Sequence, residues 1–183
     1  MAADFSPDTK HGWLDRLDAG YSLIVRTMFY AASLYVGMMM VVIVYYTSFR
    51  SLGWDYNDYS FTFIEYGFIY VLMLGCPWMV RQRAHVYIEL VTAAIPDRAR
   101  VVLSRAIAAT CFLVCLLLAI YIGMQTWQDY NWGQYDELRG QLDIKRWIVI
   151  VAMPIGFGFT ALEFLRFVFG SSLIHTGEMG VHE

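Results

Sequence analysis

Two long stretches without a single Asp, Glu, Lys or Arg constrain this chain more than any other feature. They run from Thr27 to Phe49 and from Ala106 to Gln128, and each is 23 residues long. An α-helix of about 20 apolar residues crosses the hydrocarbon core of a bilayer. Both stretches are therefore predicted to span a membrane.

Two further stretches are apolar and contain few charges. Tyr59–Val80 carries only Glu65, and Trp147–Phe169 is free of charge until Glu163 and Arg166. The composition agrees, because charged residues make up 16% of the chain, against about 25% in soluble domains. We therefore expect an all-α integral membrane protein with four transmembrane helices.

The positions of Lys and Arg indicate how the spans are oriented. Nine lie before the first span, between the second and third, or, in the case of Arg166, at the inner end of the fourth, and four lie on the other side. Because cytoplasmic loops carry the excess of Lys and Arg, both termini are predicted to be cytoplasmic. The expected segments are a cytoplasmic N-terminal segment with an amphipathic helix (1–26), spans at 27–49, 59–80, 106–128 and 147–169, outer loops at 50–58 and 129–146, a cytoplasmic amphipathic connection (81–105) and a cytoplasmic tail (170–183).

Two segments outside the spans carry an apolar stripe at helical spacing. A helix lying in the membrane interface has this pattern. For the N-terminal stripe, packing against the helical bundle is an equal alternative. In the connection after Val80, Arg81 and Arg83 could contact lipid phosphates, or simply form a positive stop for the second span. The N-terminal stripe consists of Trp13, Leu14, Leu17, Tyr21 and Ile24.

Sequence patterns of haem, metal and catalytic sites are not found. Haem in a helical bundle needs facing imidazoles, but all four histidines lie outside the expected spans. Cys111 and Cys115 lie four apart on the third span, where a packing role is favoured over redox chemistry. The net charge of −3 gives no reason to expect nucleic acid. We therefore expect no enzyme activity, cofactor, metal ion or nucleic-acid partner.

Glu65 is a carboxylate well inside the second expected span, about two turns from its outer end. Charged residues at such depth often pair with an opposite charge or mark a transport path. Two interpretations stay open. Glu65 either pairs with an Arg on a neighbouring helix or subunit, or extends to water.

Prolines and small residues predict how the helices distort and pack. Pro77 and Pro154 lack the N–H that would bond the carbonyl four residues earlier, which predicts kinks near Met73 and Ile150. Such kinks either loosen a helix or merely fit the packing. Small residues four apart allow close helix contact in membranes. These pairs are Ser33–Gly37, Ala119–Gly123 and Ala152–Gly156.

The order of several motifs resembles one known family. The second span and its connection read LGCPWMVRQRAHVYIELV and then IPDRAR, the first outer loop reads FRSLGW, and the entry to the fourth span reads LDIKRWIVIVAMPIGFGF. Over about residues 13–169 they closely resemble the small membrane subunit, called Q or DctQ, of tripartite ATP-independent periplasmic (TRAP) transporters. An acidic residue usual in the family after the loop Trp has three possible counterparts, Asp55, Asp58 and Glu65. The family's Gly, Arg, His, acidic and Pro positions correspond to Gly75, Arg81, His85, Glu89 and Pro96.

The resemblance implies a role without catalysis in the bacterial inner membrane. In this family a periplasmic substrate-binding protein delivers the substrate to the membrane. A larger multi-span permease subunit holds the substrate and sodium sites, and the small subunit braces its scaffold. The expected cargo is an organic anion or zwitterion, whose identity is decided on other chains. Candidate contacts with the partner subunit or with lipids are Arg50, Trp54, Glu65, Arg81, Arg83, His85, Trp147, Pro154 and Gly156.

The longer outer loop, 129–146, is rich in Trp, Tyr, Asp and Glu and is the expected contribution to docking of the binding protein. The alternative interpretation is a stand-alone four-helix transporter or membrane-redox protein that works as a homo-oligomer. That alternative predicts that the purified chain alone would move substrate or carry a chromophore.

Overall fold

The computed structural model describes residues 12–53, 58–82, 96–137 and 143–169. In these ranges, four helical stretches are long and apolar enough to cross a membrane, at Asp18–Ser51, Thr62–Arg81, Ala99–Trp132 and Arg146–Phe169. The prediction of an all-α protein with four spans is therefore confirmed. The helices are α1 (Gly12–Ser51), α2 (Asp58–Arg81), α4 (Asp97–Trp132), α5 (Arg146–Ile150) and α6 (Ala152–Phe169).

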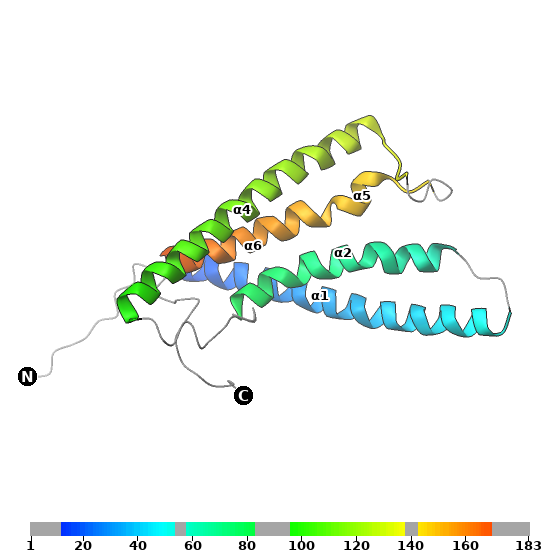
Figure 1. Ribbon diagram of the computed structural model, residues 1–183, viewed down its shortest axis with the longest axis horizontal. Helices are drawn as coiled ribbons and strands as arrows, with labels where there is room; N and C mark the ends of the chain where they lie inside the picture. Colours follow the sequence, from blue (N-terminus) through cyan, green and yellow to red (C-terminus); the bar gives the residue numbers. More distant parts are fainter. Residues whose placement is uncertain (1–11, 54–57, 83–95, 138–142, 170–183) are drawn as a thin grey trace, which may run out of the picture.

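The helices lie side by side in the order α4, α6, α2 and α1 (Figure 1). At one end of the bundle α1 and α4 begin, and α2 and α6 end. We call this the Arg81 end, and we call the opposite end, where α4 stops, the Trp132 end. Because the central pair α2 and α6 joins two outer helices, α1 and α4 each keep a broad face that none of the described helices covers.

Helix α1 joins two segments that the sequence separated. It continues without a break from Gly12 to Ser51, and at about 1.5 Å per residue its 40 residues extend for roughly 60 Å. The expected amphipathic segment is thus the first part of the same helix. Tyr21 lies against α6, where its ring stacks on Phe159 at 6.0 Å. Of the two alternatives for this segment, packing against the bundle is the one that the structure shows for Tyr21.

The contact between α1 and α2 is built on an aromatic ring over a glycine. Tyr35 of α1 stacks on Phe63 of α2 at 4.8 Å, and its hydroxyl donates to the Phe63 carbonyl at 3.5 Å. A Cβ added to Gly67 would collide with the Tyr35 ring. The absence of a side chain at Gly67 therefore lets the ring lie directly on the α2 backbone.

Helix α4 packs along α6 through one narrow stripe. Val101, Ala108, Cys115 and Ile122 recur every seven residues on its more sheltered side, which is the spacing of left-handed helix packing. At Gly123 an added Cβ would lie 3.7 Å from the Pro154 side chain. Gly123 of the predicted Ala119–Gly123 pair therefore lies at this helix contact, as small residues in membranes commonly do.

The two prolines have different local consequences. The fourth span is divided into α5 and α6 at Val151, three residues before Pro154 and beside the predicted position Ile150. Helix α2 runs without a break past Met73 and Pro77. Pro154 therefore divides its span, whereas Pro77 is accommodated inside a continuous helix.

Gly156 lies at a close approach between α2 and α6. A Cβ placed there would lie 2.5 Å from the Met73 carbonyl oxygen and 2.6 Å from the Met73 Cβ. Pro77 lacks the N–H that would otherwise bond this carbonyl within α2. The backbone of α6 thus lies against the turn of α2 at Met73. The carbonyl of that turn lacks its usual helical donor because of Pro77.

Candidate functional site

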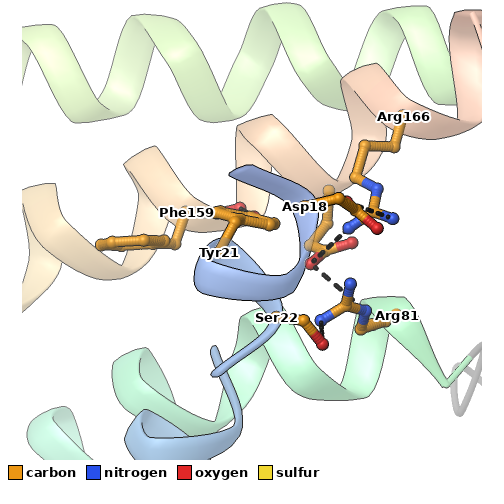
Figure 2. A network of polar contacts seen from close by, with 7 residues as sticks. Asp18, Tyr21, Ser22, Arg81, Phe159 and Arg166 are labelled. Atoms are coloured by element: carbon orange, nitrogen blue, oxygen red, sulfur yellow. Dashed lines mark hydrogen bonds and ion pairs between the residues drawn. The ribbon is translucent and has the colours of Figure 1, made fainter. Parts of the chain in front are cut away.

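A buried carboxylate ties three helices together at the Arg81 end. Glu163 of α6 is 2% exposed, and its Oε1 lies 3.8 Å from Arg81 Nε and 4.0 Å from Arg166 Nη1. Arg166 Nη2 also pairs with Asp18 Oδ1 of α1 at 3.0 Å (Figure 2). The two arginines and two carboxylates balance one another in charge. Neutralisation of this kind is what allows a charged group to remain buried.

Polar and aromatic groups of α1 complete this arrangement. Arg81 Nη1 donates to Ser22 Oγ at 2.9 Å, and the Tyr21 hydroxyl donates to the Phe159 carbonyl at 3.2 Å (Figure 2). The guanidinium carbons of Arg81 and Arg166 lie 5.9 and 5.7 Å from the Tyr21 ring centre, within reach of cation–π attraction. We name the set the Glu163 cluster: Asp18, Tyr21, Ser22, Arg81, Glu163 and Arg166.

A second buried carboxylate lies at the Trp132 end. Asp129 of α4 is fully buried. Its Oδ1 accepts a hydrogen bond from Gln125 Nε2 at 2.9 Å, and its Oδ2 pairs with Arg146 Nε at 3.4 Å. Since Arg146 begins α5, this pair joins the end of α4 to the start of the fourth span.

The connection between α4 and α5 is folded back on itself and attached to α2. Its two sides are joined by backbone bonds from Asp136 N to Ile144 O (2.8 Å) and from Arg146 N to Gln134 O (3.0 Å). The Tyr66 hydroxyl of α2 donates to the Asp136 carboxylate. The Tyr70 hydroxyl donates to the Ile148 carbonyl. These contacts hold the described part of the connection in one position on the bundle.

Two cavities lie near the Trp132 end. One, of about 400 Å³, lies between α1, α2 and the entry to α5, and the other, of about 270 Å³, lies between α4 and the fourth span. The larger is lined by Tyr35, Thr62, Phe63, Tyr66, Tyr70, Ile144, Ile148 and Val149. The smaller is lined by Gly123, Thr126, Trp127, Tyr130, Trp147 and Pro154.

The faces of α1 and α4 that point away from the bundle are apolar. On α1 the exposed large side chains are Leu23, Ile24, Tyr30, Leu34, Val36, Met38, Met40, Val41, Ile43, Val44 and Tyr45. On α4 they include Val102, Leu103, Ile107, Leu113, Val114, Leu116, Leu117, Leu118, Ile120, Tyr121 and Met124. Apolar surface on this scale requires either lipid or another membrane protein around it.

The residues predicted from sequence fall into different surroundings. Arg81 belongs to the Glu163 cluster, and Trp147 meets Tyr130 edge-on at 5.5 Å. Arg50 and Glu65 lie exposed on α1 and α2, while Pro154 and Gly156 form helix contacts inside the bundle. Trp54, Arg83 and His85, with most of the expected amphipathic connection, lie outside the described residues.

Among the described residues the buried carboxylates are Glu163 and Asp129, and not Glu65, the carboxylate singled out from the sequence. Glu163 and Arg166 are three residues apart on one helix, a spacing at which such a pair is expected. The participation of Arg81 could not be predicted from sequence, because Arg81 comes from another helix. Gln125 and Asp129, four residues apart, would have been a comparable local signal. Among the described side chains, no group of three His, Cys, Asp or Glu residues is placed to hold a metal ion.

Comparison with known proteins gives a consistent result. Residues 38–173 match the family described as tripartite ATP-independent periplasmic transporters, DctQ component. The chain is also 30% identical over 111 residues to the sialic acid TRAP transporter permease protein SiaT of Haemophilus influenzae (strain 86-028NP). This match covers 58% of the chain and 17% of the relative, so the chain spans about a sixth of that relative's length. No solved structure matches the chain.

Proposed function

Because the chain belongs to the DctQ-component family of tripartite ATP-independent periplasmic transporters, we propose that it is a non-catalytic subunit that braces a larger permease subunit. The larger subunit would carry the substrate and sodium sites in the bacterial inner membrane. The substrate class is an organic anion or zwitterion, a class that includes the sialic acid in the relative's name.

The apolar outer faces of α1 and α4 are the observation that carries this proposal. Their large side chains are exposed along most of each helix, whereas the buried carboxylates Glu163 and Asp129 are paired with arginines of this same chain. A bracing subunit needs a broad surface for its partner and a rigid interior. A transport path would instead need polar groups that face a shared cavity.

The proposed orientation places the Arg81 end in the cytoplasm and the Trp132 end in the periplasm. It rests on the excess of Lys and Arg in the segments at the Arg81 end, nine against four. In this orientation the connection between α4 and α5 faces the periplasm, where a substrate-binding protein would approach.

Co-purification tests the bracing role. The chain is tagged, expressed with the permease and binding protein encoded beside it, and isolated in mild detergent. We expect the large permease to elute with it in a one-to-one ratio, while the tagged chain expressed alone elutes without a transport partner. Elution as a defined homo-oligomer in the presence of the permease would contradict bracing and favour the stand-alone alternative.

We also propose that the connection between α4 and α5 contributes to docking of the binding protein. Its described part is held to α2 through Tyr66 and Asp136 and presents Tyr135, Glu137 and Lys145 to solvent. A surface held in position in this way binds a partner without first losing conformational freedom.

Alanine at Tyr135, Glu137 and Lys145 together is expected to reduce transport about tenfold when the binding protein is limiting, which corresponds to ~1.4 kcal/mol of binding. The measurement is uptake into vesicles containing the whole complex, at several concentrations of binding protein. Asn131→Ala, on the exposed last turn of α4, is the control and should transport normally. Unchanged uptake by the triple variant would reject the docking role while leaving the bracing role intact.

A further inference from the structure

The smaller cavity at the Trp132 end has three aromatic residues among the six that line it. Trp127 and Tyr130 come from the last turns of α4, and Trp147 comes from α5. We propose that this cavity binds the ammonium group of a zwitterionic phospholipid, with phosphatidylethanolamine as the type of ligand. The proposal requires only that the chain is embedded in a membrane, and it does not depend on which protein the chain braces.

The ring geometry suits a cation. The Tyr130 and Trp147 rings meet edge-on at 84° with centres 5.5 Å apart, so the planes of these two lining residues are nearly perpendicular. The Trp127 ring lies 6.0 Å from Tyr130 at an angle of 28°. Aromatic faces carry negative potential, and sites formed by several of them bind alkylammonium groups.

The depth of the cavity suits a lipid better than a free amine. Gly123 and Pro154 line its other part, and Tyr130 lies seven positions after Gly123, about 10 Å further along α4. The rings therefore lie near the end of the span, at headgroup depth. The part lined by Gly123 and Pro154 is apolar and lies deeper, where the glycerol and upper acyl chain of the same lipid would be.

Two cations next to a lining residue in the chain suit the phosphate of such a lipid. Lys145 and Arg146 directly precede Trp147, and the Arg146 side chain is 44% exposed. A guanidinium has five N–H donors, so Arg146 can keep its Nε against Asp129 while other donors meet a phosphate. Aromatic rings for the ammonium and basic side chains for the phosphate together match a zwitterionic headgroup.

Native mass spectrometry of the full-length chain in detergent tests the assignment. The chain is titrated with phosphatidylethanolamine and with phosphatidylglycerol of the same acyl chains, which has the phosphate but no ammonium. We expect one phosphatidylethanolamine to be retained at concentrations about tenfold lower than phosphatidylglycerol. Trp127→Leu, which keeps an apolar side chain but removes the ring, should abolish this preference. Trp132→Leu is the matched control, since Trp132 is equally exposed on α4 but does not line the cavity, and it should keep the preference.

A second pair of variants protects the test against misfolding. Tyr130→Phe keeps the aromatic face and should retain the preference, whereas Tyr130→Leu should lose it. Equal retention of the two lipids by the unmodified chain would overturn the proposal, as would an equal loss in Trp132→Leu. Displacement of the lipid by millimolar free ethanolamine would overturn the lipid assignment in favour of a soluble amine. Displacement by the purified permease would identify a side chain of that protein as the occupant instead.

Discussion

Arg81→Met is expected to lower the free energy of unfolding by about 3–5 kcal/mol, the cost of leaving a buried charge without its partner. Glu163 is almost completely buried, and of its two arginine partners the substitution would leave Arg166, at 4.0 Å from its Oε1. The link from Arg81 to Ser22 of α1 would be lost as well. The measurement is unfolding of the purified chain by SDS titration in mixed micelles.

A double variant separates the charge effect from lost packing. Glu163→Gln removes the negative charge that Arg81→Met leaves buried without its partner. The double variant Arg81→Met/Glu163→Gln should therefore recover more than half of the stability lost in Arg81→Met. Arg105→Met, on the exposed face of α4, is the control and should change stability by less than about 0.5 kcal/mol. A single Arg81→Met variant as stable as the unmodified chain would show that Glu163 does not need this arginine.

Gly156→Ala is expected to destabilise the bundle by about 1–3 kcal/mol, the usual cost of overpacking. The new Cβ would lie 2.5 Å from the Met73 carbonyl oxygen, and a backbone atom cannot turn aside as the end of a side chain can. Helices α2 and α6 would have to move apart along the contact that also holds the Glu163 cluster. The measurement is the same unfolding titration.

The matched control for this substitution is Gly158, two residues further along α6. A Cβ at Gly158 would meet nothing within 4 Å. Gly158→Ala should therefore be neutral or stabilising by about 0.5–1 kcal/mol, because alanine loses less conformational freedom in a helix than glycine. The two substitutions are thus expected to have opposite signs. Equal effects at both positions would contradict the close contact at Gly156.

The spans could be predicted from sequence because they depend on local composition. The stretches Thr27–Phe49 and Ala106–Gln128 both lie within helices of the structure. The helices that contain these stretches are longer than the predicted spans. The absence of charge marks the part of a helix that meets lipid, whereas the helix ends where its backbone hydrogen bonds end. The break at Val151 was likewise predictable from Pro154, because a proline acts on its own turn.

The contacts between helices were predictable only in part. Small residues at Ala152 and Gly156 indicated a close approach, but the identity of the opposing group, the Met73 carbonyl, depends on how α2 packs against α6. The same holds for Glu163, whose partner Arg81 lies 82 residues away in the chain. The exposure of a side chain could not be predicted from sequence position either. Glu65 lies well inside its predicted span, yet it is exposed on the outside of α2.

The arrangement of the helices has a consequence for biogenesis. Helices α1 and α2 form one hairpin, and α4 with α5 and α6 forms the next, so each hairpin can enter the bilayer as a unit during synthesis. The positive charge of Arg81 is made in the first hairpin and the negative charge of Glu163 in the second. Neither is neutralised by the other until both hairpins have been inserted and brought together. Burial of this pair therefore has to wait for the second hairpin, and a nascent chain that stops before α6 leaves Arg81 without this partner.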